Sequence, residues 1–194
     1  MPVFFALSLL VFISAGGSEQ QEDKSFAWTM ALQNIRTEDL LPFSAPVKSS
    51  TGERFRLVIR PEADCYCYVI AESTNGEEVA ALRAGLLDSG KEWLSPDIVL
   101  APPGGSESIF VVVSRDEQAA LVQSIDAYNS GNTPVRRRIL MNEVLRIRGE
   151  VSRYREIPEK PIVVGGSARG NPGRNEGVEF SGLDTYVKTI SIEH

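Results

Sequence analysis

The heptapeptide CYCYVIA, residues 65–71, constrains the fold of this 194-residue chain more than any other stretch. In a β-strand, successive side chains point to opposite faces. Cys65, Cys67 and Val69 would then share one face, and Tyr66, Tyr68 and Ile70 the other. Both faces are largely apolar, which is typical of a central strand that is covered on two sides.

Several other segments have the period of two that is typical of strands. In FRLVIRP, residues 55–61, the apolar Phe55, Leu57 and Ile59 alternate with Arg56, Val58 and Arg60, and Pro61 ends the strand. The Asn75-Gly76 pair predicts a turn, followed by a hairpin partner at residues 78–84. Further strands are expected at residues 91–96, 108–114, 161–164, 178–180 and 185–194.

Two helices are expected near residues 115–129 and 134–155. Ser114 and Glu117 have the spacing of a capping box for the first helix. Thr133 is suited to cap the second helix, and Pro134 to begin it. The expected buried stripes are Leu121, Val122, Ile125 and Tyr128 in the first helix, and Leu140, Val144, Ile147 and Val151 in the second. Strands flank the helices on both sides, so the fold class is α+β, with a mainly antiparallel sheet or sandwich and two helices inserted before the C-terminal strands.

The N-terminal part of the sequence predicts export. Residues 1–17 form an apolar run and then small residues, typical of a signal peptide, although no Lys or Arg precedes the run. The apolar run, residues 3–13, is too short at about 1.5 Å per residue to cross a bilayer core of about 30 Å, so no transmembrane span is expected. Either the true start lies upstream, or the amino terminus alone supplies the positive charge; the alternative to export is a buried N-terminal strand or helix.

The remaining chain is divided into two parts by its composition. Residues 18–50 are interpreted as a polar linker and docking segment, in which Trp28 and Phe43 are available to dock on a domain. Residues 51–194 are interpreted as a single β-rich domain that contains both helices.

The charge balance restricts the class of partner. The chain has 26 acidic and 20 basic residues and a formal net charge of −6, which argues against nucleic acid or an anionic membrane as the main partner. Arginines are nevertheless concentrated in and after the second helix, at positions 136, 137, 138, 146, 148, 153 and 155. They form either a solvated face with i,i+4 ion pairs to Glu143, Glu150 and Glu156, or a basic surface for an acidic protein or an anionic glycan.

No set of catalytic residues emerges from the sequence. The only histidine is His194, the last residue, which argues against a hydrolase with a histidine base. Gly165 and Gly170 have the G-x-x-x-x-G spacing, but Asn171 and Pro172 follow where a phosphate-binding loop needs Lys and then Ser or Thr. We therefore expect a connecting loop at residues 165–177, and no catalytic, cofactor-binding or metal-binding residues.

Cys65 and Cys67 are the only cysteines. A disulfide between positions i and i+2 of one strand needs Cα atoms about 6.6 Å apart, at the limit of disulfide geometry. A metal site usually needs four ligands, and the other soft ligands are missing. The leading interpretation is that both cysteines fill space in a core; a strained or regulatory disulfide and a metal site are the alternatives.

These motifs together resemble a known family. They are the FRLVI strand at residues 55–59, Tyr66 and Tyr68, the Asn75-Gly76 turn, and the turn of Pro103, Gly104, Gly105, Ser106 and Glu107 that leads into SIFVVVS. This run is similar to the bacterial family called domain of unknown function 4384, and TYVKTISIEH resembles the end of spirochaete-type members. The chain departs from the family in lacking a Pro-Asn pair after the Asn-Gly turn and in one added glycine within residues 103–107.

The resemblance implies an exported or envelope-associated bacterial domain with no established chemistry and no catalytic residues to transfer. We therefore expect a non-enzymatic binding or assembly module of the periplasm or cell envelope, with an envelope protein or glycan as its partner. The alternative is an enzyme or sensor that acts on envelope polymers or thiols.

Overall fold

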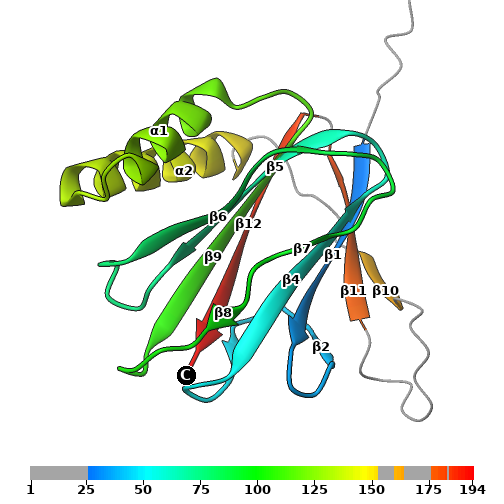
Figure 1. Cartoon of the computed structure of the whole chain (residues 1–194). Helices are drawn as coiled ribbons and strands as arrows, with labels where there is room; N and C mark the ends of the chain where they lie inside the picture. Colours follow the sequence, from blue (N-terminus) through cyan, green and yellow to red (C-terminus); the bar gives the residue numbers. More distant parts are fainter. Residues whose placement is uncertain (1–25, 153–159, 164–175, 183) are drawn as a thin grey trace, which may run out of the picture.

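The computed structural model describes residues 26–152, 160–163, 176–182 and 184–194. The expected signal peptide, Arg153, Arg155 and most of the loop at 165–177 lie outside these residues. Two β-sheets face each other, and two helices cover the outer face of one of them (Figure 1). The α+β class, the mainly antiparallel sheets and the position of the helices before the C-terminal strands are confirmed.

The first sheet, sheet A, contains seven strands that are all paired antiparallel. Its main order is β10 (Lys160–Val163), β11 (Glu176–Gly182), β1 (Phe26–Asn34), β4 (Arg54–Pro61) and β7 (Trp93–Leu94). Two short strands complete it, since β2 (Leu40–Leu41) pairs with β1 and β8 (Ile98–Val99) pairs with β4.

The second sheet, sheet B, contains five strands in the order β3 (Val47–Lys48), β12 (Thr185–Glu193), β9 (Ser106–Ser114), β5 (Cys65–Glu72) and β6 (Val79–Leu87). The β3–β12 pair is parallel and the other pairs are antiparallel. β5 contains the CYCYVIA segment and lies between β9 and β6. The prediction that this segment is a central strand is therefore confirmed.

The two faces of β5 belong to two different cores. Cys65, Cys67 and Val69 point into the core between the sheets, where they meet the fully buried Phe55, Leu57 and Ile59 of β4. Tyr68 and Ile70 point the other way, into the core under the helices. Because one strand lines both cores, its side chains are apolar on both faces.

Part of the segment expected to be a linker and docking region, residues 26–50, is included in the described fold. β1 lies inside this segment and pairs with both β4 and β11. Trp28 is fully buried, and its ring stacks on Phe26 and Phe180, with centroids 5.0 and 5.6 Å apart. The alternation in FAWTMALQN was obscured because Ala27 and Ala31 are also apolar, although they lie on the opposite face.

The helices α1 (Ala119–Asn129) and α2 (Pro134–Ser152) lie against the outer face of sheet B. The predicted stripes are confirmed, since Leu121, Ile125, Leu140, Val144 and Ile147 are all buried against Tyr68, Ile70, Phe110 and Val112 of the sheet. In the described part of the chain, no helix combines the length and the apolar character needed to span a membrane.

One helix cap was predicted correctly and the other was not. Thr133 caps α2, because its Oγ1 accepts a hydrogen bond from the Arg136 backbone N–H at 3.3 Å. The capping box of Ser114 and Glu117 is wrong: α1 begins after Gln118 without a side-chain cap from its own sequence. The Gln118 N–H instead donates to the Tyr68 hydroxyl at 2.9 Å.

Candidate functional site

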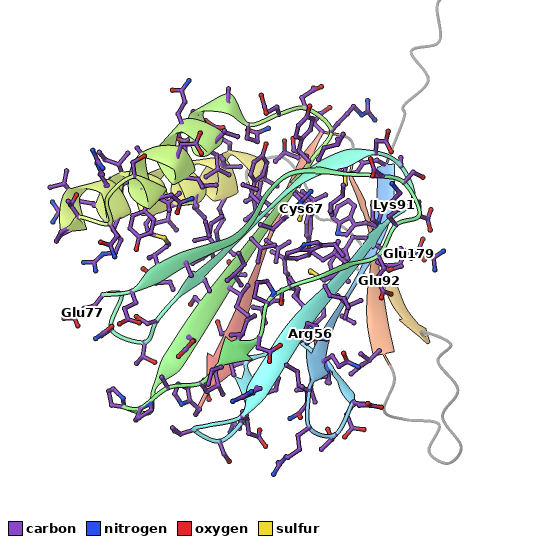
Figure 2. The ribbon with its side chains drawn as sticks, viewed as in Figure 1. Arg56, Cys67, Glu77, Lys91, Glu92 and Glu179 are labelled. Carbon is purple, nitrogen blue, oxygen red and sulfur yellow. The ribbon has the colours of Figure 1, made fainter. Side chains whose placement is uncertain are left out.

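Cys65 and Cys67 are free and buried (Figure 2, where Cys67 is labelled). Burial raises the pKa of the Cys65 thiol to about 11 and also raises the pKa of the Cys67 thiol. Both residues are therefore neutral thiols at physiological pH, which are poor nucleophiles and poor metal ligands. Within the described ranges, no group of three or more His, Cys, Asp and Glu side chains could hold a metal ion.

The arginines of α2 have different environments. Arg146 lies between Glu143 and Glu150, with a nitrogen–oxygen distance of 2.6 Å to each. Its hydrogen bonds lower the pKa of Glu143. The interpretation as a solvated face with ion pairs is correct for this half of the helix.

The arginines at the start of α2 form no ion pair like that of Arg146 within the described part of the chain, although the charge of Arg137 acts on the carboxylate of Glu72. Arg136 donates to the Gly131 carbonyl at 3.4 Å, and Arg137 donates to the Glu77 carbonyl. Arg138 is exposed. The first turn of α2 contains no acidic residue, so three positive charges lie at the positive end of the helix dipole.

The outer face of α2 also carries three exposed apolar side chains. Val135, Ile139 and Leu145 have exposed fractions of 66%, 53% and 48%. With Arg138 and Asn142, which are also exposed, they follow the spacing i, i+3, i+4, i+7 and i+10, which places them on one side of a helix. We call these five residues, Val135, Arg138, Ile139, Asn142 and Leu145, the outer stripe of α2.

A hollow of about 480 Å³ lies at one end of the sandwich, lined by residues 34–36 after β1 and residues 50–54 before and at the start of β4. Asn34 shapes the first wall, because its Oδ1 accepts the backbone N–H groups of Arg36 at 2.9 Å and Thr37 at 3.2 Å. Gly52 forms the second wall with a φ of 88°, which favours glycine. The two walls are joined by the hydrogen bond from Ile35 N–H to Arg54 C=O at 3.0 Å.

Charged side chains line this hollow. Arg36 Nη2 lies 2.6 Å from Glu53 Oε1, and the Ser49 hydroxyl donates to the other carboxylate oxygen. The hydrogen bond from Ser49 and the charge of Arg36 lower the pKa of Glu53. Arg54 is largely exposed, and its Nη1 lies 4.0 Å from the carboxylate of Asp97.

His194 lies directly behind the hollow. β12 carries it into the fold, where its side chain has an exposed fraction of 0%. Its Nδ1 lies 3.1 Å from the Thr51 hydroxyl, and its Nε2 lies 3.6 Å from Glu107 Oε1. The three side chains thus form a row of hydroxyl, imidazole and carboxylate, in which burial raises the pKa of Glu107.

The sequence did not predict this arrangement. Thr51, Glu107 and His194 come from three distant segments, and the turns that line the hollow have no periodicity. The pairing of β9 with β12 is what brings the last residue to Gly105, where the two residues exchange backbone hydrogen bonds of 2.7 and 2.9 Å. The turn signals at Asn34 and Gly52 were the only local indication of the walls.

Comparison of the chain with protein-family models, with curated proteins and with solved structures finds no match.

Proposed function

We propose that this chain is an exported, non-enzymatic binding or assembly module of the bacterial cell envelope, and that the outer stripe of α2 is its docking surface for an acidic envelope protein. The observation that carries the proposal is the exposure of apolar side chains on a helix whose opposite face is already buried.

The outer stripe is not needed to attach α2 to the sheet, since Leu140, Val144 and Ile147 do this on the opposite face. Yet three of the six large hydrophobic side chains that are exposed in the described residues lie on this stripe. Clustered apolar side chains on a surface favour contact with another protein. An anionic glycan would leave them in water, so a protein is the better partner.

The charge of this region favours an acidic partner. The outer stripe contains Arg138 and no carboxylate, and Arg136 and Arg137 lie beside it at the positive end of the helix. Like charges at a helix end cost stability unless a negative partner offsets them. Carboxylates on a partner would supply this compensation, and they would also direct its approach to this basic region of an acidic chain.

Export and the envelope location rest on the signal-like residues 1–17 and on the family resemblance. Intact mass and N-terminal sequencing of the protein from its host test them. Loss of about the first 17 residues is expected, whereas a retained Met1 would contradict export.

The docking proposal is tested by site-specific photo-crosslinking in intact host cells. A photoreactive residue replaces Ile139 in one variant and Val99 in a matched control, because Val99 has a similar exposed fraction, 47%, on the opposite sheet. We expect one dominant envelope protein from position 139 and not from position 99. The partner, once purified, should bind the Arg138→Glu variant at least about tenfold more weakly than the wild type. The outer stripe would be excluded as the docking surface if both positions gave the same crosslinked products, or if Arg138→Glu bound the partner as tightly as the wild type.

The alternative function is an enzyme or sensor that acts on envelope polymers or thiols. Action on thiols has little support, because both cysteines are buried with raised pKa values. Recognition of a polymer or of its fragments is favoured by the hollow beside His194. The double variant Cys65→Ser, Cys67→Ser distinguishes action on thiols from recognition of a polymer. If this variant has native stability and gives a native host phenotype, action on thiols is excluded and only polymer recognition at the hollow is left.

A further inference from the structure

We propose that the hollow between the turn after β1 and the turn before β4 is a binding site for a small ligand with an oxyanion, either a carboxylate or a phosphate, held by Arg54 and the hydroxyl of Thr51, with Arg36 adding positive charge to the lining. This site is separate from the outer stripe of α2: in Figure 1 the helices lie at the upper left, whereas β2 and the C-terminus, which lie next to the hollow, are at the bottom.

The charges that line the hollow favour an anion. Two arginines oppose one carboxylate, so the lining has a net charge of +1 in a chain whose net charge is −6. A guanidinium group has a planar arrangement of N–H donors that matches the oxygens of a carboxylate or phosphate. The hollow therefore combines positive charge with donors of suitable geometry.

Arg54 is the better placed of the two arginines. Asp97 lies closer to Arg56, at 2.9 Å, than to Arg54, at 4.0 Å, so its charge is largely engaged elsewhere. Arg36 instead shares Glu53 with Ser49. Since Glu53 repels an anion that approaches Arg36 closely, we place the oxyanion between Arg54 and Thr51.

The walls of the hollow are preorganised. Gly52 N–H donates to the Leu100 carbonyl at 2.7 Å, and Glu53 N–H donates to the Ser50 carbonyl at 3.1 Å. Together with the two hydrogen bonds that Asn34 accepts, these bonds hold both turns before a ligand arrives. Little conformational entropy is then lost on binding, which favours affinity.

His194 acts as a positioning residue for Thr51. A proton on Nδ1 would be donated to the Thr51 oxygen, and the hydroxyl hydrogen is then free to bond the oxyanion. Among the described residues, the buried Nε2 has no hydrogen-bond partner, and Glu107 Oε1 lies 3.6 Å from it.

Binding is measured by calorimetry and by NMR titration of the full chain with four probes: glucuronate, glucose 6-phosphate, inorganic phosphate and neutral glucose. At least one charged probe is expected to bind about tenfold more tightly than glucose. Preference for glucuronate identifies the oxyanion as a carboxylate, and preference for glucose 6-phosphate or inorganic phosphate identifies it as a phosphate. Equal binding of glucose, or no binding of any charged probe, would overturn the proposal.

Variants locate the site. Arg54→Gln and Thr51→Val are each expected to weaken binding about tenfold, the loss expected for one charge-assisted hydrogen bond, whereas Thr51→Ser keeps the hydroxyl and most of the affinity. Arg60→Gln is the matched control, because Arg60 is an exposed arginine of the same strand β4 that does not line the hollow. A loss with Arg60→Gln as large as that with Arg54→Gln would show a nonspecific charge effect and contradict the site.

Substitution tests the role of His194. His194→Phe removes the ring nitrogen beside the Thr51 hydroxyl and is expected to weaken glucuronate binding about tenfold. His194→Asn keeps a donor near Thr51 and should restore most of the affinity. Equal glucuronate affinity of His194→Phe and the wild type would exclude His194 from the site.

Discussion

At the scale of single residues, the two cysteines of β5 show how burial decides chemistry. Their spacing is compatible with redox or metal chemistry, but their side chains lie in the apolar core between the sheets. In this environment the charged thiolate loses its hydration and the neutral thiol is favoured. The same two residues on an exposed edge strand would be reactive.

We therefore predict that neither cysteine of the folded protein is alkylated by iodoacetamide at neutral pH. The raised pKa of Cys65, about 11, and burial of both sulfur atoms protect them. Mass spectrometry after timed labelling gives the number of modified thiols. Both cysteines should react when the same experiment is carried out in concentrated guanidinium chloride, and fast labelling without denaturant would contradict the prediction.

At the scale of elements, the sequence predicted those strands and helices whose periodicity is local. β4, β5, β6, β9 and both helical stripes follow from the spacing of apolar residues along each segment. The cap of α1 cannot be predicted from local spacing, because the Gln118 N–H donates to the hydroxyl of Tyr68, which lies 50 residues earlier in the chain. The Ser114–Glu117 spacing had the form of a capping box, but Ser114 still belongs to β9.

Tyr68→Phe tests this long-range cap. The variant keeps the buried ring and removes the acceptor of the Gln118 N–H, so we predict a loss of about 1 kcal/mol in the free energy of unfolding. Glu117→Ala, which would break the predicted capping box, should change it by less than about 0.5 kcal/mol. Urea denaturation measures both values. If Glu117→Ala lowers the free energy of unfolding more than Tyr68→Phe does, the predicted capping box of Ser114 and Glu117 stabilises α1 after all.

The candidate sites were predicted less well than the fold. The sequence shows the concentration of arginines in α2. Whether each arginine has a partner depends on the direction in which its side chain leaves the helix and on neighbours such as Glu77. The hollow was missed because residues 34–36, 50–54 and 194 meet only after both sheets have formed. Polar residues in turns have no period, so their proximity is a property of the tertiary structure.

At the scale of the whole molecule, the central position of β1 in sheet A makes residues 26–50 part of the domain. We predict that a chain that starts at residue 51 does not fold, because β4 and β11 lose their shared neighbour and the core loses Trp28, Met30 and Leu32. A chain that starts at residue 18 should fold with native stability. Circular dichroism and NMR dispersion distinguish the two. A folded chain from residue 51 would show that β1 is dispensable.

The contact of Trp28 with Phe180 and Tyr186 joins the two ends of the described chain. During synthesis at about 5–20 residues per second, Trp28 waits on the order of ten seconds for these partners to be made. The core between the sheets therefore cannot form before the C-terminal strands have been synthesised. Because sheet pairing joins residues that are distant in the sequence, we expect folding to take milliseconds to seconds once the chain is complete. Until then the aromatic strands are exposed to their surroundings, so a holdase chaperone should bind this protein while it is being translated.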